Sequence, residues 1–478
     1  MRSRYLPLCL LLLGILVLYP SPATADSDAS STRHLIDDVS RLNSTVVHEV
    51  FQPTTEADLY AAIQRAALYR LKISIAGKRH SQGGHTLYPD ALVLDMTAFN
   101  KILRLDQEKK LITVQSGVTW RQIQDYVNPY DLAVKVQQSS NIFTVGGSIS
   151  VNAHGRDPGY GPIIHTVKSF RLMTADGSII PVSRDENPDL FSLVIGGYGL
   201  FGVIVDVDLE LAENHVLERR TRTLNCTDYP QYFMKEVKDN AGVELHYAWP
   251  SVGKKDFLQR CIVTSFIRTN KTPNGIFKLK EETGVERNQA FLSLSRKYGW
   301  GKEFRWFMQE HLADHTQKII SRNNAMRPEV RFLDYTSPTD TDILQEYFVP
   351  VHNFISFMEG MRKILLADHV NLLSVTVRYV PKDSEAVLSY APEDEFAVVL
   401  YVNQERSTAG RKKAEGWTQK LVDLVLAQEG TYYLPYQLYA TRQQIRSAFP
   451  RLDEFFEKKR FYDPQELFMN QFYFQYGS

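Results

Sequence analysis

The first half of the chain alternates between segments with helical and with strand-like spacing of apolar residues. From Leu59 to Leu71 apolar side chains recur with helical spacing, and Thr55-Glu56-Ala57-Asp58 before them resembles a capping box. Ile73–Ala76 and Ala91–Met96 are short apolar runs typical of strands. The pattern predicts a domain in which helices and strands alternate.

Further along, paired strand-like runs indicate hairpins. Ile102–Leu105 and Leu111–Gln115 flank a polar turn, and Val167–Thr174 and Ile179–Val182 flank Asp176-Gly177. Gly202–Leu211 alternates Val or Ile with Asp or Glu, which predicts a half-buried strand. Two helical segments are also expected, at 118–127 and, as a small-residue helix or turn, from 145.

The second half changes character near Asn214, where glycine becomes rarer and aromatic residues more frequent. Leu372–Val380 and Phe396–Asn403 predict buried strands, and Lys413–Leu426 predicts an amphipathic helix. We therefore place a domain boundary near residue 214.

Composition agrees with a globular protein of two or three domains. The 478 residues are 44% hydrophobic and 23% charged, which excludes a disordered or collagen-like chain. The 55 basic residues balance 55 acidic ones, so the net charge does not indicate a nucleic-acid partner.

The N-terminus has the features of an export signal. Arg2 and Arg4 precede an apolar run from Tyr5 to Tyr19, and Ala23-Thr24-Ala25 follows. A membrane anchor is the alternative, but the run is shorter than the roughly 20 residues that span a bilayer. We expect residues 1–25 to be a signal peptide, the mature protein to be periplasmic or extracellular, and no membrane span to remain.

Removal of that segment leaves Cys226 and Cys261. In an oxidising compartment they either pair or stay as two separate thiols, and the sequence leaves both open. Neither has a second cysteine or a histidine at metal-ligand spacing, so no metal site is expected.

Three loops concentrate glycine, at Gly77–Gly84, Gly146–Gly161 and Gly196–Gly202. Glycine permits positive φ, so successive backbone N–H groups can converge on a phosphate. Each loop alone is explained equally well as a turn, but three in one domain suit a cofactor with a diphosphate. The last loop contains a literal G-x-G-x-x-G, yet a strand-like segment from Val203 follows it, which argues against a Rossmann helix.

The order of these segments resembles the vanillyl-alcohol-oxidase superfamily, whose FAD-binding domain is of the p-cresol methylhydroxylase type. The resemblance covers nearly all of the mature chain. Its motifs here are the segments beginning at Pro53, the loop Gly77-Lys78-Arg79-His80-Ser81, Thr144-Val145-Gly146-Gly147-Ser148, Asn152-Ala153-His154-Gly155, Gly196–Gly202, Glu346–Pro350, Arg378-Tyr379-Val380 and Tyr462–Asn470.

The resemblance implies an α+β fold. An FAD-binding domain of two α/β subdomains, residues 26–213, would be closed by a substrate-binding cap with an antiparallel sheet, residues 214–440. Residues 441–478 would return to the FAD-binding domain.

The resemblance also implies FAD, bonded in such proteins to a loop histidine that matches His80; a non-covalent role for His80 is the alternative. Imidazole is a suitable nucleophile toward an electron-poor flavin methyl group. The residues expected to bind the cofactor are Gly77, Lys78, Arg79, His80, Ser81, Gly84, His85, Val145, Gly146, Gly147, Ser148, Asn152, His154, Gly155, Gly197, Gly202, Val203, Ile204 and Asn470.

The chain departs from its relatives at the expected catalytic positions. Alditol and aldonolactone oxidases carry a Glu two residues before the arginine that matches Arg378, and here Thr376 stands there. Their lysine-bearing segment is replaced by one that ends at Tyr436, and Ser139 or a neighbour stands where cytokinin dehydrogenases carry an Asp. Arg378 and Tyr436 are the catalytic candidates, and Tyr401 is a further polar candidate.

Together these features predict an exported FAD-dependent oxidoreductase. Its donor would be an alcohol of a sugar-like small molecule, and its acceptor oxygen or another electron acceptor. The alternative is a protein of the same fold that binds flavin or ligand without turnover.

Overall fold

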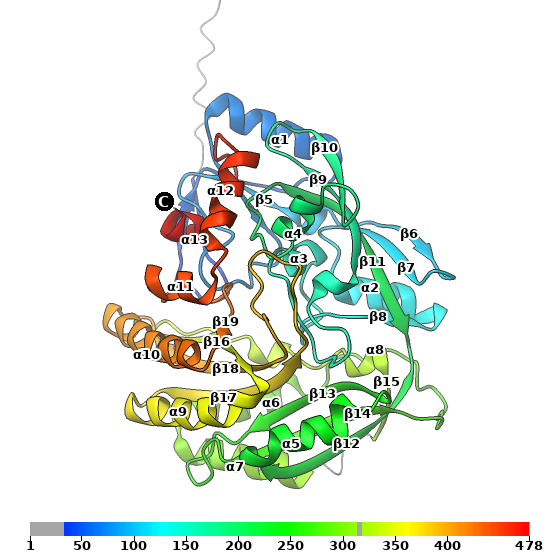
Figure 1. The fold of residues 1–478 in the computed structure, drawn as a ribbon, viewed down its shortest axis with the longest axis vertical. Helices are drawn as coiled ribbons and strands as arrows, with labels where there is room; N and C mark the ends of the chain where they lie inside the picture. Colours follow the sequence, from blue (N-terminus) through cyan, green and yellow to red (C-terminus); the bar gives the residue numbers. More distant parts are fainter. Residues whose placement is uncertain (1–32, 313–317, 478) are drawn as a thin grey trace, which may run out of the picture. The chain divides into compact units, whose positions relative to one another are not determined.

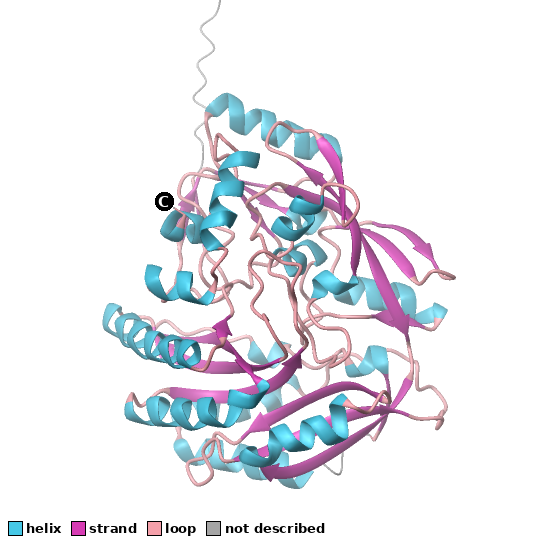
Figure 2. Ribbon diagram, viewed as in Figure 1, coloured by secondary structure: helices cyan, strands magenta, loops and turns pink. Residues whose placement is uncertain are grey.

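Four β-sheets organise residues 33–312 and 318–477, the part of the chain that the computed structural model describes (Figure 1, Figure 2). The predicted signal peptide lies outside these residues. Within them, no helix is long and apolar enough to cross a bilayer, and no group of His, Cys, Asp or Glu side chains is arranged to hold a metal. A short antiparallel pair, β1 (His34–Ile36) and β2 (Thr45–Val47), begins the described chain.

The next sheet is parallel, in the order β3 (Glu49–Phe51), β5 (Leu92–Asp95), β4 (Ile73–Ala76). Helix α1 (Glu56–Tyr69) joins β3 to β4, and its apolar side, including Leu59 and Ile63, is buried. The predicted capping box is confirmed, because Thr55 and Asp58 exchange side-chain and backbone hydrogen bonds.

A six-stranded antiparallel sheet follows, and both predicted hairpins are found in it. Its order is β10 (Ile179–Ser183), β9 (Val167–Met173), β11 (Val203–Glu213), β7 (Leu111–Gln115), β6 (Ile102–Asp106), with β8 (Leu132–Val134) paired to β11. Helices α2 (Trp120–Val127), α3 (Val145–Ser150) and α4 (Pro188–Val194) lie between these strands in sequence. Since β11 follows Gly202 directly, the rejection of a Rossmann motif is confirmed.

After Glu213 the chain enters an eight-stranded sheet. Its order is β15 (Ile319–Ser321), β12 (Val216–Asn225), β14 (Arg260–Arg268), β13 (Val243–Pro250), β17 (Asn371–Val380), β18 (Glu395–Glu405), β16 (Asp340–Pro350), β19 (Thr431–Tyr432). The pairings recorded within it are antiparallel, as the α+β prediction requires. We call it the cap sheet.

Helices pack on one face of the cap sheet. Phe233 of α5 (Tyr229–Phe233) lies 4.7 Å from Tyr379 between ring centroids, and Phe357 of α9 (Phe354–Ala367) lies 5.8 Å from Tyr347. The other helices of this half are α6 (Val285–Lys297), α7 (Gly299–Leu312), α8 (Arg322–Ala325) and α10 (Thr408–Ala427).

The register places a different set of side chains on the opposite face of the cap sheet. Glu346 of β16 and Thr376 of β17 both pair with Val399 of β18, so the three side chains share a face. Arg378, two residues beyond Thr376, lies on the same face. We call this the polar face.

The last part of the chain comprises α11 (Arg442–Ala448), α12 (Leu452–Tyr462) and α13 (Gln471–Tyr476). Between α12 and α13 the backbone returns to the parallel sheet. The N–H of Ile73 donates to Leu467 O at 2.7 Å, and the N–H of Met469 donates to Ile73 O at 2.8 Å. The C-terminal residues thus extend the sheet beside β4.

Cys226 and Cys261 form a disulfide, which resolves the alternative left open by the sequence. It joins residues 35 positions apart, with the two Cα atoms 5.2 Å from each other. It holds the end of β12 against the start of β14, at the edge of the cap sheet.

Replacing both cysteines by alanine should lower the free energy of unfolding by about 3 kcal/mol, because the cross-link restricts the unfolded chain. Urea unfolding of the variant measures this, and wild type in excess reductant is the matched comparison. A variant within about 0.5 kcal/mol of the oxidised wild type would contradict a stabilising bridge.

Candidate functional site

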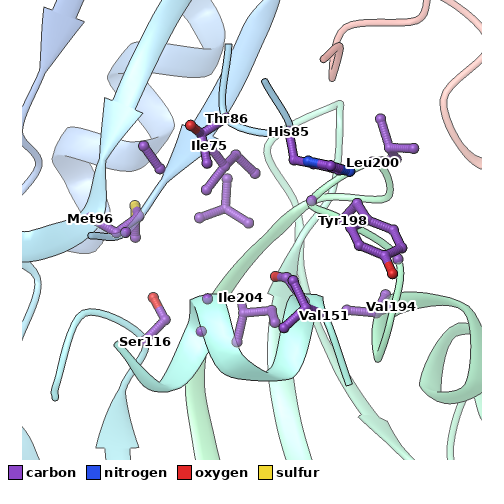
Figure 3. A pocket seen from close by; sticks show the side chains of 18 of the residues that line it. Ile75, His85, Thr86, Met96, Ser116, Val151, Val194, Tyr198, Leu200 and Ile204 are labelled. Carbon is purple, nitrogen blue, oxygen red and sulfur yellow. The ribbon is translucent and has the colours of Figure 1, made fainter. Parts of the chain in front are cut away.

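A pocket lies where the parallel sheet, α3 and the loop before β11 meet (Figure 3). It encloses about 690 Å3 of space not filled by protein atoms, part of it open to solvent. Nine of the predicted cofactor residues line it: Gly77, Ser81, His85, Gly146, Gly147, Gly197, Gly202, Val203 and Ile204. Sequence reasoning thus brought together residues from three separate loops.

Glycine is needed in this pocket for two reasons. A Cβ on Gly77 would lie 2.2 Å from Thr144 Oγ1, and one on Gly146 would lie 2.7 Å from Ser116 Cβ, so backbone and neighbours are in close contact. Gly199 has a φ of +74° and Gly202 a φ of +149°, a region that side chains other than glycine rarely adopt. The loops therefore bring backbone, rather than side chains, to the pocket wall.

The lining suits a flavin dinucleotide. Buried Ser116 Oγ and Thr86 Oγ1 have no hydrogen-bond partner among the described residues, so polar groups are available to a ligand. Ile75, Met96, Val151, Val194, Leu200 and Ile204 provide apolar walls (Figure 3). Backbone-lined loops for a diphosphate and apolar walls for rings are the combination that FAD requires.

Other predicted cofactor residues lie outside the lining of this pocket and have different contacts. Lys78 is exposed, and Arg79 forms an ion pair with Asp95 at 2.8 Å. Val145 is part of the hydrophobic core, and the hydroxyl of Ser148 donates to Gln138 Oε1 at 2.7 Å.

Four further predicted residues hold the loops in place. The Nδ2 group of Asn152 donates to Asp383 at 3.0 Å, and that of Asn470 donates to Tyr198 O at 2.9 Å. The N–H of Gly84 donates to Asp38 at 3.1 Å. A Cβ on Gly155 would lie 2.7 Å from Gln137 O. These residues do not line the pocket but stabilise the loops around it.

Two histidines of the first loop are held in their neutral form. Burial, with a contribution from Lys78, lowers the pKa of His80 to about 4, and burial lowers that of His85 to about 3. The His80 ring packs edge-on against Phe143, 4.7 Å between centroids, whereas His85 stacks on Phe472 and lines the pocket. At neutral pH the His80 imidazole therefore has a free lone pair for bonding.

A second group of polar side chains lies where the polar face meets the FAD-binding loops. His154 Nε2 lies 2.6 Å from Glu346 Oε1, and the side chains are only 3% and 2% exposed. The hydroxyl of Tyr436 donates to Glu346 Oε2 at 3.2 Å. Burial, and then the charge of Glu346, raises the pKa of Tyr436 well above its usual value, so the phenol keeps its proton.

Arg378 completes this group from the polar face. Its Nη2 donates to Ser139 Oγ at 2.8 Å, while its buried Nε has no partner among the described residues. Tyr401, the further candidate, is engaged elsewhere, because its hydroxyl donates to Asp342 at 2.5 Å. Of the two tyrosines, only Tyr436 is joined to Glu346.

Backbone contacts place Tyr436 next to the predicted flavin-attachment loop. The N–H of Gln82 donates to Pro435 O at 2.7 Å, and a Cβ on Gly83 would lie 2.4 Å from Tyr436 O. The hydroxyl of Tyr433 donates at 2.8 Å to the carbonyl of Val151, which lines the cofactor pocket. The catalytic candidates and the cofactor loops therefore form one neighbourhood.

Sequence reasoning missed Glu346 as a site residue, although it noted the strand that contains it. Only the pairing of β16 and β17 with β18 shows that Glu346 and Arg378 share a face. It also missed Thr86, Ser116 and Tyr198 in the pocket wall. Ser116 and Thr86 lie in segments without a motif, so no local signal marks them.

The fold and the pocket define a flavin-nucleotide-binding protein of the α+β class. Comparison with known proteins agrees: residues 47–183 match the family model described as FAD binding domain. This segment is an FAD-binding domain, and FAD as cofactor is confirmed.

Several curated relatives are similar to part of the chain. It is 30% identical over 214 residues to the mitochondrial L-galactono-1,4-lactone dehydrogenase of Arabidopsis thaliana, covering 45% of this chain and 35% of that protein. It is 28% identical over 191 residues to the L-gulonolactone oxidase of Mus musculus, covering 40% of this chain and 41% of that protein. An FAD-linked oxidoreductase of Neurospora crassa is 26% identical over 160 residues, 33% of this chain and 32% of that protein. The chain thus matches well under half the length of these relatives.

An alanine at Gly147 should weaken FAD binding about tenfold or more, because its methyl group would enter the pocket, where only Thr144 Oγ1 lies within 4 Å. Flavin content per protein and the Kd of FAD for the flavin-free protein measure the effect. Gly159→Ala is the control, since nothing lies within 4 Å of a Cβ there. Equal FAD affinity in both variants would place the cofactor elsewhere.

Proposed function

We propose that this protein oxidises a hydroxyl-bearing carbon of a small, sugar-like molecule with bound FAD as the oxidant. The observation that supports this most directly is the hydrogen bond between Tyr436 and Glu346, beside the loops of an FAD-binding domain. The lactone enzymes among the relatives support the substrate class. Oxygen or another electron acceptor then takes the electrons.

Bound FAD supplies the acceptor for the hydride that leaves when the substrate C–H bond breaks. The hydroxyl proton of the substrate must leave as well, since the product is a carbonyl. Tyr436 Oη takes this proton while its own proton passes to Glu346 Oε2, so no phenolate has to form in a buried site. The charge of Glu346 is spread by the hydrogen bond to His154.

His80 is proposed to carry the flavin covalently. The support is its place in the attachment loop and its lowered pKa, which keeps the ring nucleophilic at neutral pH. Export is proposed on the N-terminal pattern and on the disulfide, since disulfides persist mainly in oxidising compartments.

Tyr436→Phe should lower kcat by about 100-fold, because the variant has no hydroxyl to pass the substrate proton on to Glu346. The rate of flavin reduction by substrate under anaerobic conditions measures this step directly. It is recorded as the rate at which the visible absorbance of the flavin is lost. Glu346→Gln should reduce its flavin at a similarly low rate. Tyr401→Phe is the matched control, because the hydroxyl of Tyr401 donates to Asp342 and not to Glu346. Unchanged flavin reduction in Tyr436→Phe would remove the proposed proton path. A wild-type flavin that no alcohol, lactone or sugar reduces would favour a binding protein without turnover.

His80→Ala should release its flavin on acid denaturation, whereas wild type should keep yellow colour with the protein. The His85→Ala variant is the control, since His85 lies in the same loop but its ring packs against Tyr198 and Phe472. Free flavin from denatured wild type would show that His80 does not form a covalent bond.

A further inference from the structure

Arg378, which lies near Tyr436, and Arg156, which lies over the ring of Tyr247, form no ion pair with a carboxylate of the described residues. Among the described residues, no carboxylate lies within 4.0 Å of the guanidinium of Arg378 or of Arg156. Arg378 bonds to the neutral hydroxyl of Ser139, and Arg156 Nη2 donates to Ala325 O at 2.7 Å. Buried or half-buried arginines are usually paired, so this arrangement needs a reason.

The two side chains approach each other from opposite sides. Arg378 belongs to β17 of the cap sheet, and Arg156 follows His154 in a loop of the FAD-binding half. The Arg156 guanidinium lies 5.3 Å from the ring centroid of Tyr247 on neighbouring β13. Burial lowers the pKa of Arg156; the charge of Arg378 lowers it further, while Tyr247 and Asp157 oppose this lowering.

The acidic groups nearby have other partners. Glu346 accepts from Tyr436 and contacts His154. Asp157 binds Arg322 through Oδ1; its charge acts on adjacent Arg156, but the two form no ion pair within 4.0 Å. Thr376, which shares the polar face with Arg378, is neutral. Arg378 and Arg156 are therefore half-buried cations that form no ion pair.

We infer that the substrate carries a carboxylate, which Arg378 and Arg156 bind while Tyr436 addresses a hydroxyl on the same molecule. This rests on the proposed function and narrows its substrate class to sugar acids and related hydroxy acids. Planar guanidinium groups match a carboxylate in shape, and a buried, charge-assisted pair is stronger than a neutral hydrogen bond. The unpartnered Nε of Arg378 supplies one donor for it.

The test uses ligand pairs that differ only at one terminus: gluconate against sorbitol, and galactonate against galactitol. Calorimetric titration of the flavin-loaded full mature chain gives each Kd without requiring turnover. At least one carboxylate should bind about tenfold or more tightly than its neutral counterpart. Arg378→Met and Arg156→Met should each remove that preference, lowering affinity for the carboxylate more than affinity for the neutral ligand.

Further variants separate loss of the carboxylate-binding group from misfolding. Arg378→Lys keeps the charge without the planar fork and should bind the carboxylate with intermediate affinity. Arg65→Met is the matched control, since Arg65 lies on α1 and pairs with Glu49 at 2.9 Å. Urea unfolding and flavin content are recorded for every variant.

The outcomes separate the two proposals. Carboxylate preference that depends on both arginines supports the inference even if no ligand reduces the flavin, in which case only the proposed oxidation fails. Equal binding of acids and neutral polyols, or no binding of either acid, overturns it, even if a neutral alcohol is oxidised. Loss of flavin instead of carboxylate affinity in the Met variants also overturns it, because the arginines would then serve the cofactor.

Discussion

The contact between His154 and Glu346 joins the cofactor-binding half of the molecule to the cap sheet at the point where both meet the site. Both side chains are almost fully removed from water, and since Nδ1 of His154 has no partner among the described residues, its ring depends on Glu346 for a hydrogen bond. Breaking this pair would leave a polar group unsatisfied in a core that includes Phe348, Tyr390 and Tyr433. The position of Tyr436, and hence of the proposed proton path, follows from where Glu346 is held.

A second buried contact fixes the same junction further along. Arg322 binds Asp157 and, at 2.9 Å, Glu244, and it also donates to the carbonyl of Lys135 at 2.7 Å. Burial raises the pKa of Asp157 to about 6, and Arg322 opposes that rise. Since Arg322 and Glu244 belong to the half that carries the cap sheet, and Asp157 follows Arg156, this network also orients the loop that presents Arg156. The ion pairs of Arg322 therefore help to position Arg156, although Arg156 takes no part in them.

Local patterns sufficed for much of the fold. The capping box at Thr55, the Asp176-Gly177 hairpin and the strand after Gly202 each follow from chemistry within a few residues of the feature. Resemblance to a flavoprotein superfamily added the cofactor and three loops that do line one pocket. What could not be predicted depends on register: Glu346 and Arg378 lie 32 positions apart in sequence and share a face only because both strands pair with β18. The role of Arg156 could not be predicted from the sequence either. Arg156 comes near Arg378 only when the cap sheet packs against the cofactor loops.

The return of the chain to β4 has a consequence for the order of events in biosynthesis. Ile73 is bonded on both sides by residues 467 and 469, and Asn470 holds the carbonyl of Tyr198 in the pocket wall. The cofactor pocket therefore gains this support only after residues 467–470 have been synthesised. A ribosome-bound chain that has not yet reached them has the FAD-binding sequence but not its supporting edge. Completion of the pocket wall thus waits for a segment almost 400 residues downstream of β4.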